Sequence, residues 1–137
     1  MGIDVWWGSG SPYCWRVLLA LELKQLPYAS HCLQFDLQEH KAPPMLAMNP
    51  RGRLPVLRDG DYVVFESLAV LYYLDLKHPQ VPLFGHSAEE AAVIMRVINE
   101  FQAYTEARLM GIVDALGANR SPQLDESLAA AMHLVAG

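Results

Sequence analysis

The N-terminal part of the chain alternates short apolar runs with turn-forming residues. Residues 3–7 form an apolar, aromatic and β-branched run that ends in Gly8-Ser9-Gly10, which predicts a first strand. Ser11 is a good N-cap and Pro12 suits the first helical position, so a helix with an apolar face should follow. Residues 28–33 then predict a second strand. Strand, helix and strand in this spacing are typical of a right-handed parallel crossover unit.

A hairpin and a second main helix are predicted next. Residues 34–53 are interrupted by prolines and a glycine, and they predict a loop region with at most one short helix. The apolar runs 54–57 and 62–65 flank Asp59-Gly60, a strong hairpin signal, so these two strands should pair antiparallel. A largely apolar helix should then occupy residues 68–77.

The pattern changes in the C-terminal part of the chain. Residues 80–86 contain a proline and a glycine and predict a linker. Ser87 and Glu90 resemble a capping box, and a long amphipathic helix should follow until Gly117 ends it. Residues 124–135 predict one more short helix. The apolar stripe of the long helix would consist of Ala91, Met95, Ile98, Phe101, Thr105, Leu109, Ile112 and Leu116.

The order strand, helix, strand, loop, hairpin and helix is the plan of a thioredoxin-like domain. We therefore expect an α/β thioredoxin-like domain, made of a βαβ unit and then a ββα unit, followed by a short all-α segment. The expected boundaries are residues 1–79 for the thioredoxin-like domain, 80–86 for the linker and 87–137 for a partial helical domain.

Composition and charge exclude several classes of function. The 137 residues are 53% hydrophobic with a formal net charge of −5, and no Lys/Arg-rich stripe is present that would bind nucleic acid. No unbroken apolar run is long enough to span a bilayer, and the first residues lack the pattern of a signal peptide, so no membrane contact is expected. Two cysteines are too few for a disulfide framework, which favours the reducing cytoplasm. The dispersed histidines predict no metal site.

Three local motifs are similar to those of a known family. They are Ser11-Pro12-Tyr13-Cys14-Trp15-Arg16 at the first helix, residues 49–57 (NPRGRLPVL) around the third strand, and Phe65-Glu66-Ser67 at the third helix. In this order and spacing the chain resembles a glutathione transferase. The resemblance implies that the N-terminal domain binds glutathione as a cosubstrate, and that the protein conjugates its thiol to a small electrophile, as in detoxification.

Ser11 would be the catalytic residue in this comparison. Its hydroxyl would donate a hydrogen bond to the sulfur of glutathione, and it can also serve as an ordinary helix cap. Lowering the thiol pKa from about 8.5 by about 2 units requires roughly 2.7 kcal/mol. A hydrogen bond to a charged acceptor supplies about 1.5–3 kcal/mol, and the positive end of the following helix adds about 0.3–1 kcal/mol. No metal or base is therefore needed.

Two other residues compete with Ser11 for this assignment. Ser9 lies in the flexible turn just before it and could bring its hydroxyl to the same place. Cys14 corresponds to the second cysteine of a glutaredoxin-like dithiol motif whose first cysteine is replaced by serine. A packed Cys14 would be unreactive, whereas an exposed one at a helix N-terminus would permit glutathione-disulfide chemistry.

The remaining glutathione-binding residues follow from the other two motifs. Leu54 and Pro55 match a family loop whose proline is cis, where Leu54 would pair with the backbone of the cysteinyl unit. Glu66 would accept a hydrogen bond from the γ-glutamyl ammonium. Ser67 and the first amides of its helix would receive the α-carboxylate, although Ser67 is also predicted to act simply as that helix's cap.

The glycyl carboxylate of glutathione needs a cation as its partner. Arg53, Lys41 and His40 are the candidates in the loop region, and the resemblance favours Arg53. Solvated surface charge is the alternative role for each of them.

Glutathione transferases continue through further helices that this chain lacks. The apolar stripe of its long helix would then form a larger exposed patch than soluble monomers show, so a homodimer is expected, unless the chain is part of a longer protein. Three functions remain open: a transferase, a glutathione-binding or protein-interaction module without catalysis, and a glutaredoxin-like reductase that acts through Cys14.

Overall fold

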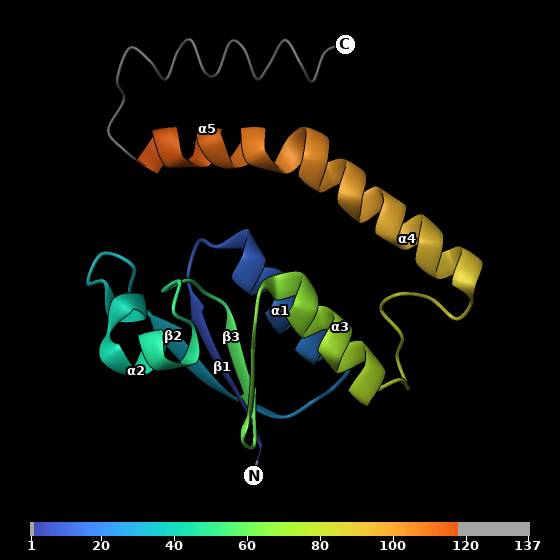
Figure 1. Ribbon diagram of the computed structural model, residues 1–137, viewed down its shortest axis with the longest axis horizontal. Helices are drawn as coiled ribbons and strands as arrows, with labels where there is room; N and C mark the ends of the chain where they lie inside the picture. Colours follow the sequence, from blue (N-terminus) through green and yellow to red (C-terminus); the bar gives the residue numbers. More distant parts are fainter. Residues whose placement is uncertain (1, 118–137) are drawn as a thin grey trace. The chain divides into compact units, whose positions relative to one another are not determined.

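The computed structural model describes residues 2–117 and divides the chain into two compact units. Unit 1 comprises Met1–Phe84 and contains a four-stranded sheet with helices packed around it (Figure 1). Unit 2 begins at Gly85, and the regular structure described in it, which runs to Gly117, is helical. The expected fold class, an α/β thioredoxin-like domain followed by a helical segment, is therefore confirmed. The short helix predicted over residues 124–135 lies outside the described residues.

The sheet has the strand order β2-β1-β3-β4. β1 (Ile3–Gly8) pairs parallel with β2 (Tyr28–Leu33), as the crossover pattern predicts, and antiparallel with β3 (Val56–Asp59). β4 (Tyr62–Phe65) pairs antiparallel with β3, which confirms the predicted hairpin. The third strand begins two residues later than predicted, because Pro55 has no N–H with which to enter the ladder.

Two helices cover one face of the sheet and create the core of unit 1. α1 (Pro12–Leu23) and α3 (Ser67–Lys77) lie next to each other on this face (Figure 1). Residues four apart on each helix and two apart on β1 point toward the same layer, so their apolar side chains meet. The buried cluster consists of Ile3, Val5, Val17, Leu21, Leu57, Val64, Val70 and Leu74.

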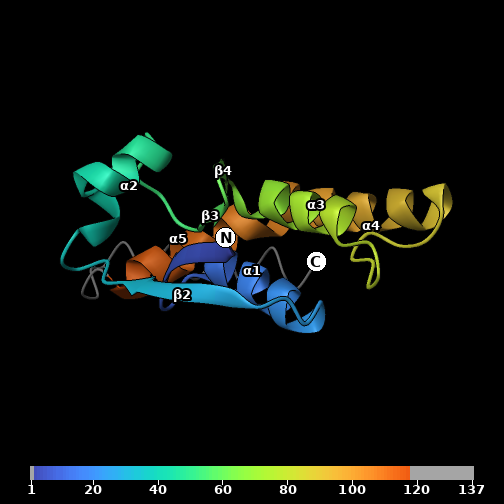
Figure 2. The ribbon, with the colours of Figure 1, turned by 90° about the horizontal axis from the view of Figure 1, so that it is seen from below.

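The predicted loop region contains slightly more regular structure than expected. A 3₁₀ turn, η1 (Glu39–Lys41), precedes α2 (Pro43–Met48), in which Pro43 occupies the first helical position. Figure 2 shows α2 set apart from α1 and α3. Met45 is the buried residue of α2, while most of the surrounding residues are exposed. The loop therefore has a small anchor of its own and can present side chains beside the sheet.

Unit 2 contains the long helix that the C-terminal pattern predicts. α4 (Ala88–Phe101), a π-helical segment η2 (Gln102–Glu106) and α5 (Ala107–Gly117) follow one another without a break in helical structure. Ser87 caps the first turn, since its Oγ accepts from the Glu90 amide at 3.2 Å. No side chain described in this unit is buried, and no helix among residues 2–117 is long and apolar enough to cross a membrane.

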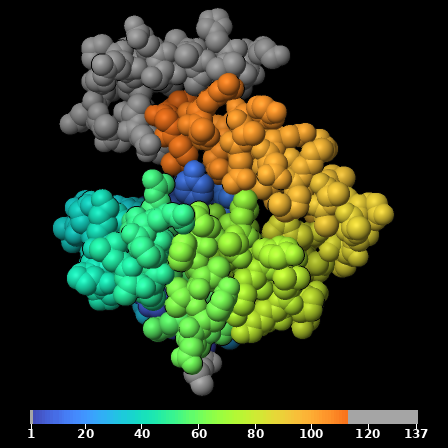
Figure 3. Space-filling model, in the orientation of Figure 1, coloured from blue at the N-terminus to red at the C-terminus, as the bar shows by residue number. Residues whose placement is uncertain are grey.

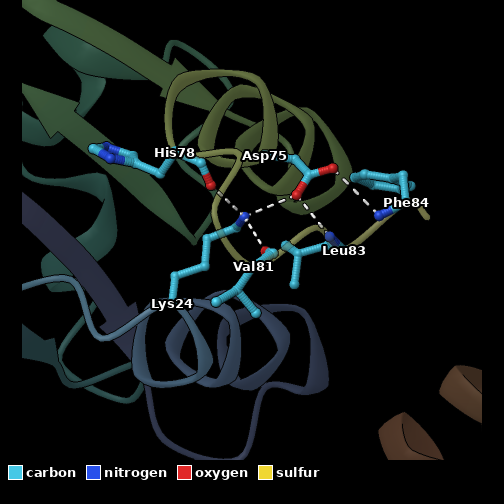
Figure 4. Close-up of polar contacts among 6 residues, drawn as sticks. All are labelled: Lys24, Asp75, His78, Val81, Leu83 and Phe84. Carbon is cyan, nitrogen blue, oxygen red and sulfur yellow. Dashed lines mark hydrogen bonds and ion pairs between the residues drawn. The ribbon is translucent and has the colours of Figure 1, made fainter. Parts of the chain in front are cut away.

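A buried ammonium group joins the C-terminal ends of α1 and α3. The side chain of Lys24, which follows α1, is only 1% exposed, and its Nζ lies 2.8 Å from Asp75 Oδ1 on α3 (Figure 4). Nζ also donates to the carbonyls of His78 at 2.8 Å and Val81 at 2.6 Å. A buried ammonium is stable only when its donors are satisfied, and here three acceptors surround it.

Asp75 extends this contact to the segment after α3. Its carboxylate accepts from the backbone amides of Leu83 at 2.6 Å and Phe84 at 3.2 Å (Figure 4). Burial raises the pKa of Asp75, but the hydrogen bonds from Lys24 and these amides outweigh it and hold the pKa below its ordinary value. Residues 80–84, part of the expected linker, are therefore fastened to unit 1.

Replacing Lys24 by Met should destabilise unit 1 by about 3 kcal/mol, because Asp75 and two carbonyls would lose a buried partner. Urea unfolding followed by tryptophan fluorescence measures this loss. Lys77→Met is the matched control, since that ammonium binds Asp59 but is 46% exposed and should contribute much less. Equal losses of stability in the two variants would show that the buried Lys24 ammonium contributes no more than an exposed ion pair.

Candidate functional site

Ser11 lies at the junction of the sheet and α1, where it caps the helix. Its Oγ accepts a hydrogen bond from the Cys14 amide at 3.3 Å, which confirms the predicted capping role. The preceding turn uses Gly10 at φ +85°, a conformation that favours glycine. This arrangement occupies one acceptor position of the Ser11 hydroxyl.

An open pocket of about 410 Å³ lies beside Ser11, a volume within the usual range of small-molecule sites, about 300–1,000 Å³. Five of the candidates from the sequence line it together, although they come from three separate segments. Ser9, in contrast, is exposed and does not line this pocket. The lining residues are Ser11, Phe35, His40, Lys41, Arg51, Gly52, Arg53 and Leu54.

The pocket is rich in cationic groups, and the sequence interpretation missed one of them. Lys41 and Arg53 were expected there, but Arg51 also lines the pocket. Arg51 belongs to the same nine-residue motif as Arg53, so its position in that motif was the available signal. A site with this many positive charges favours a ligand with carboxylate groups.

A buried asparagine shapes the loop that carries the two arginines. Asn49 is 2% exposed, its Nδ2 donates to the Arg53 carbonyl at 2.8 Å, and its Oδ1 accepts from the Arg51 amide at 3.1 Å. Gly52 has φ +57°, and a Cβ there would lie 3.2 Å from Lys41 Cγ. The tight turn therefore requires both the amide side chain and the glycine.

His40 is buried and lines the pocket. It is 9% exposed, stands edge-on to Phe35 with ring centroids 5.1 Å apart, and its Nδ1 has no hydrogen-bond partner among the described residues. Desolvation, and then the charge of Lys41, lower the pKa of His40 below its ordinary value. Both effects favour the neutral ring of His40, and its buried Nδ1 without a partner is a position where a ligand group could bind.

Cys14 is packed inside unit 1 and has no exposed surface. Its Sγ accepts from the Gly8 amide at 3.4 Å. Burial raises the pKa of the Cys14 thiol, despite opposing hydrogen bonds from Ser11 and Gly8. A buried thiol with a raised pKa is a poor nucleophile, which favours the packed, unreactive alternative.

The start of α3 differs in one detail from the prediction. Ser67 is the first residue of the helix and is buried, whereas Glu66 occupies the N-cap position with φ +68° and makes no side-chain capping bond. The expectation that Ser67 caps the helix was therefore wrong, because the chain enters the helix one residue earlier. Glu66 instead directs its carboxylate toward Arg51, with 3.6 Å between Oε1 and Nη1.

The predicted isomer of the Leu54-Pro55 bond is confirmed, since this peptide bond is cis. Leu54 lines the pocket, and Pro55 is buried directly before β3. On the face of unit 1 seen in Figure 3, the segment around α2 (teal) lies beside the hairpin and α3 (green). The three sequence motifs meet, because Ser11 and residues 51–54 line one pocket and Arg51 pairs with Glu66.

Comparison with known proteins identifies the family that the sequence motifs resemble. Residues 10–77 match the family described as glutathione S-transferase, N-terminal domain. The chain is 50% identical over 70 residues to glutathione S-transferase A of Pleuronectes platessa, covering 50% of this chain and 31% of that protein. It is 37% identical over 91 residues to glutathione S-transferase 1 of Dianthus caryophyllus, covering 66% and 41% respectively. A glutathione S-transferase crystal structure from the Antarctic clam Laternula elliptica matches with TM-score 0.82 and 36% identity, covering 99% of this chain and 64% of that one.

The structure defines a thioredoxin-like domain with an open pocket at the start of its first helix. The matched family, the relatives and the similar structure then agree that the chain belongs to the glutathione transferase family. The chain spans less than half the length of these two curated relatives. Among residues 2–117, no three His, Cys, Asp or Glu side chains lie together as metal ligands would.

Replacing Asn49 by Ala should release the loop that carries Arg51 and Arg53. Two hydrogen bonds of a buried amide are lost, so we expect about 2 kcal/mol of destabilisation. Amide hydrogen exchange should also become faster at Arg51, whose N–H loses its acceptor. Asn99→Ala, which removes an exposed amide on α4, is the control. Unchanged exchange at Arg51 would show that Asn49 does not hold this loop.

Proposed function

We propose that this chain binds glutathione in the pocket at the start of α1, stabilises its thiolate with the Ser11 hydroxyl and transfers it to a small electrophile. The observation that carries the proposal is that Ser11 shares one pocket with His40, Lys41 and Arg53. A hydroxyl for the sulfur and cations for carboxylates are the groups that binding of this tripeptide requires. Membership of the transferase family supports the same ligand.

The state of the Ser11 hydroxyl supports its role as a donor. Because Oγ already accepts from the Cys14 amide, the hydroxyl is polarised toward donating its proton. A thiolate at the start of α1 would also benefit from the positive end of the helix dipole. Ser11 would thus hold the sulfur in its ionised form, and the thiolate would attack the electrophile, forming a carbon–sulfur bond.

The two ends of glutathione would be bound by different parts of unit 1. Glu66 would accept from the γ-glutamyl ammonium, while Ser67 and the first amides of α3 would bind the α-carboxylate. Leu54, held beside Pro55, would pair with the cysteinyl backbone. These roles match the chemistry of each group.

The glycyl carboxylate would lie at the other end of the pocket. Lys41 and Arg53 provide positive charge there, and His40 has the free Nδ1 described above. A carboxylate beside His40 would offset the unfavourable charge of Lys41 and favour the protonated ring. Glycyl recognition would therefore depend on pH.

A second candidate function is glutathione binding without catalysis. It is supported by the lining of the pocket, whose residues supply groups for the tripeptide, while none of them is assigned to an electrophile. Conjugation of no electrophile in a broad panel, combined with retention on immobilised glutathione, would support this alternative. The reductase alternative is weakened by the burial of Cys14.

We also propose a cytoplasmic homodimer, in which partner contacts cover apolar side chains of unit 2. Met95, Phe101 and Leu109 are each at least 40% exposed, and exposing an apolar stripe of this kind to water is unfavourable. Sedimentation velocity would test this state, and a monomer at micromolar concentration would exclude it.

Ser11→Ala should lower kcat/KM for glutathione conjugation by about 10–100-fold, because the hydrogen bond to the thiolate is lost. The pKa of bound glutathione, measured by thiolate absorbance, should rise in parallel. Ser9→Ala is the matched control, since that hydroxyl is exposed outside the pocket. A folded Ser11→Ala protein with undiminished turnover would remove Ser11 from the mechanism.

Binding of S-methylglutathione, whose sulfur does not titrate, should strengthen as the pH falls below neutrality. The pKa of free His40 is lowered, and a bound carboxylate raises it, so the complex takes up a proton that the free protein does not hold. The gain should approach about tenfold for each unit of pKa shift. Calorimetry at several pH values measures it, and His40→Gln should make the profile flat. An affinity that falls toward acid in the unmodified protein would contradict this role.

A further inference from the structure

Arg51, which lines the pocket, forms an ion pair with Glu66. The Nη1–Oε1 distance is 3.6 Å, and their side chains are 66% and 62% exposed. Arg51 also lines the pocket itself, and its amide is held by buried Asn49. Glu66 directly precedes α3 and does not itself line the pocket. Two segments distant in sequence therefore place opposite charges next to each other.

The pair has little to contribute to the stability of the fold. Exposed ion pairs add little to folding, and at 3.6 Å this one is longer than a good charge-assisted hydrogen bond. The Glu66 side chain makes no capping bond to α3, and its φ of +68° is uncommon outside glycine. Both charged groups are thus accessible to a ligand and loosely held by each other.

We propose that Arg51 and Glu66 together recognise the α-amino-acid group at the γ-glutamyl end of the ligand. This inference rests on the proposed function, in which glutathione is the ligand. Its γ-glutamyl unit carries an ammonium and a carboxylate on the same carbon atom, and the pair presents one complementary charge to each. Glu66 binds the ammonium, and Arg51 binds the α-carboxylate in addition to Ser67 and the start of α3.

Binding then exchanges partners. The ligand's ammonium replaces the Arg51 guanidinium beside Glu66, and the ligand's carboxylate replaces Glu66 beside Arg51. One long, solvated ion pair becomes two shorter charge-assisted contacts, so the exchange favours the complex. Arginine suits this role because its planar guanidinium can donate two parallel hydrogen bonds to a carboxylate, which lysine cannot. Arg51 is therefore a specificity-determining residue for α-amino acids at this end of the ligand.

The test compares three ligands by NMR titration, which also measures weak binding. They are glutathione, its glutaryl analogue without the ammonium, and its 4-aminobutanoyl analogue without the α-carboxylate. Arg51→Gln should lower the affinity for glutathione and for the glutaryl analogue about five- to tenfold, which is the effect of losing one partly exposed charge-assisted contact. It should leave the 4-aminobutanoyl analogue unchanged. Arg51→Lys should recover part of the lost affinity, because the positive charge remains while the planar guanidinium that donates two parallel hydrogen bonds is absent.

Arg96→Gln is the matched control. Arg96 forms a comparable exposed pair with Glu100 in unit 2, and its removal changes the net charge by the same amount. It should leave all three affinities unchanged.

Three results would overturn the inference while the proposed function stands. Tighter glutathione binding by Arg51→Gln would show that Arg51 only competes for Glu66. Equal weakening of all three ligands would indicate a nonspecific field effect, and no change for any ligand would exclude a contact. If the unmodified protein binds no glutathione at all, the proposed function itself fails, so the two failures are distinguishable.

Discussion

The buried ammonium of Lys24 is the interaction on which the geometry of the site depends. It joins the C-terminal end of α1 to the C-terminal end of α3 through Asp75 and the chain that follows. The N-terminal ends of the same two helices carry Ser11 and Glu66. Because the helices are rigid bodies packed side by side, a clamp at one end limits how far their other ends can move. This polar contact lies at the ends of the helices opposite to Ser11 and Glu66, and it thus helps to hold those two residues in position.

The pocket is lined by positive charges, whereas the chain as a whole is negatively charged. The formal net charge is −5, yet Lys41, Arg51 and Arg53 gather around one opening. Such a local field concentrates small anions near the site although the rest of the surface repels them. Asn49 makes this possible, since its side chain holds the loop on which two of the three cations lie. A buried amide with no chemistry of its own therefore determines where the charges are.

Much of the fold followed from local patterns, and the exceptions have physical causes. The crossover unit, the hairpin and the long C-terminal helix were predicted because periodicity and turn residues act over a few positions. The start of β3 was misplaced because a proline can look like part of an apolar run while lacking the N–H that a strand needs. The cap of α3 was misassigned because Glu66 adopts a positive φ, which no pattern of residue types predicted. Asn49 was missed because its importance lies in two backbone contacts that appear only in the folded loop.

Residue types and their spacing were enough to determine the class of fold, the family motifs and the presence of Ser11 before a helix. These are local properties, because a cap, a strand or a turn is decided by neighbouring residues. Tertiary structure alone decided that Ser11, His40 and Arg53 line one pocket, that Cys14 is buried, and that Arg51 lies opposite Glu66. Such facts depend on how separate segments pack. Burial, pKa and the distance between charges are properties of that packing, so they could not be predicted from local sequence patterns.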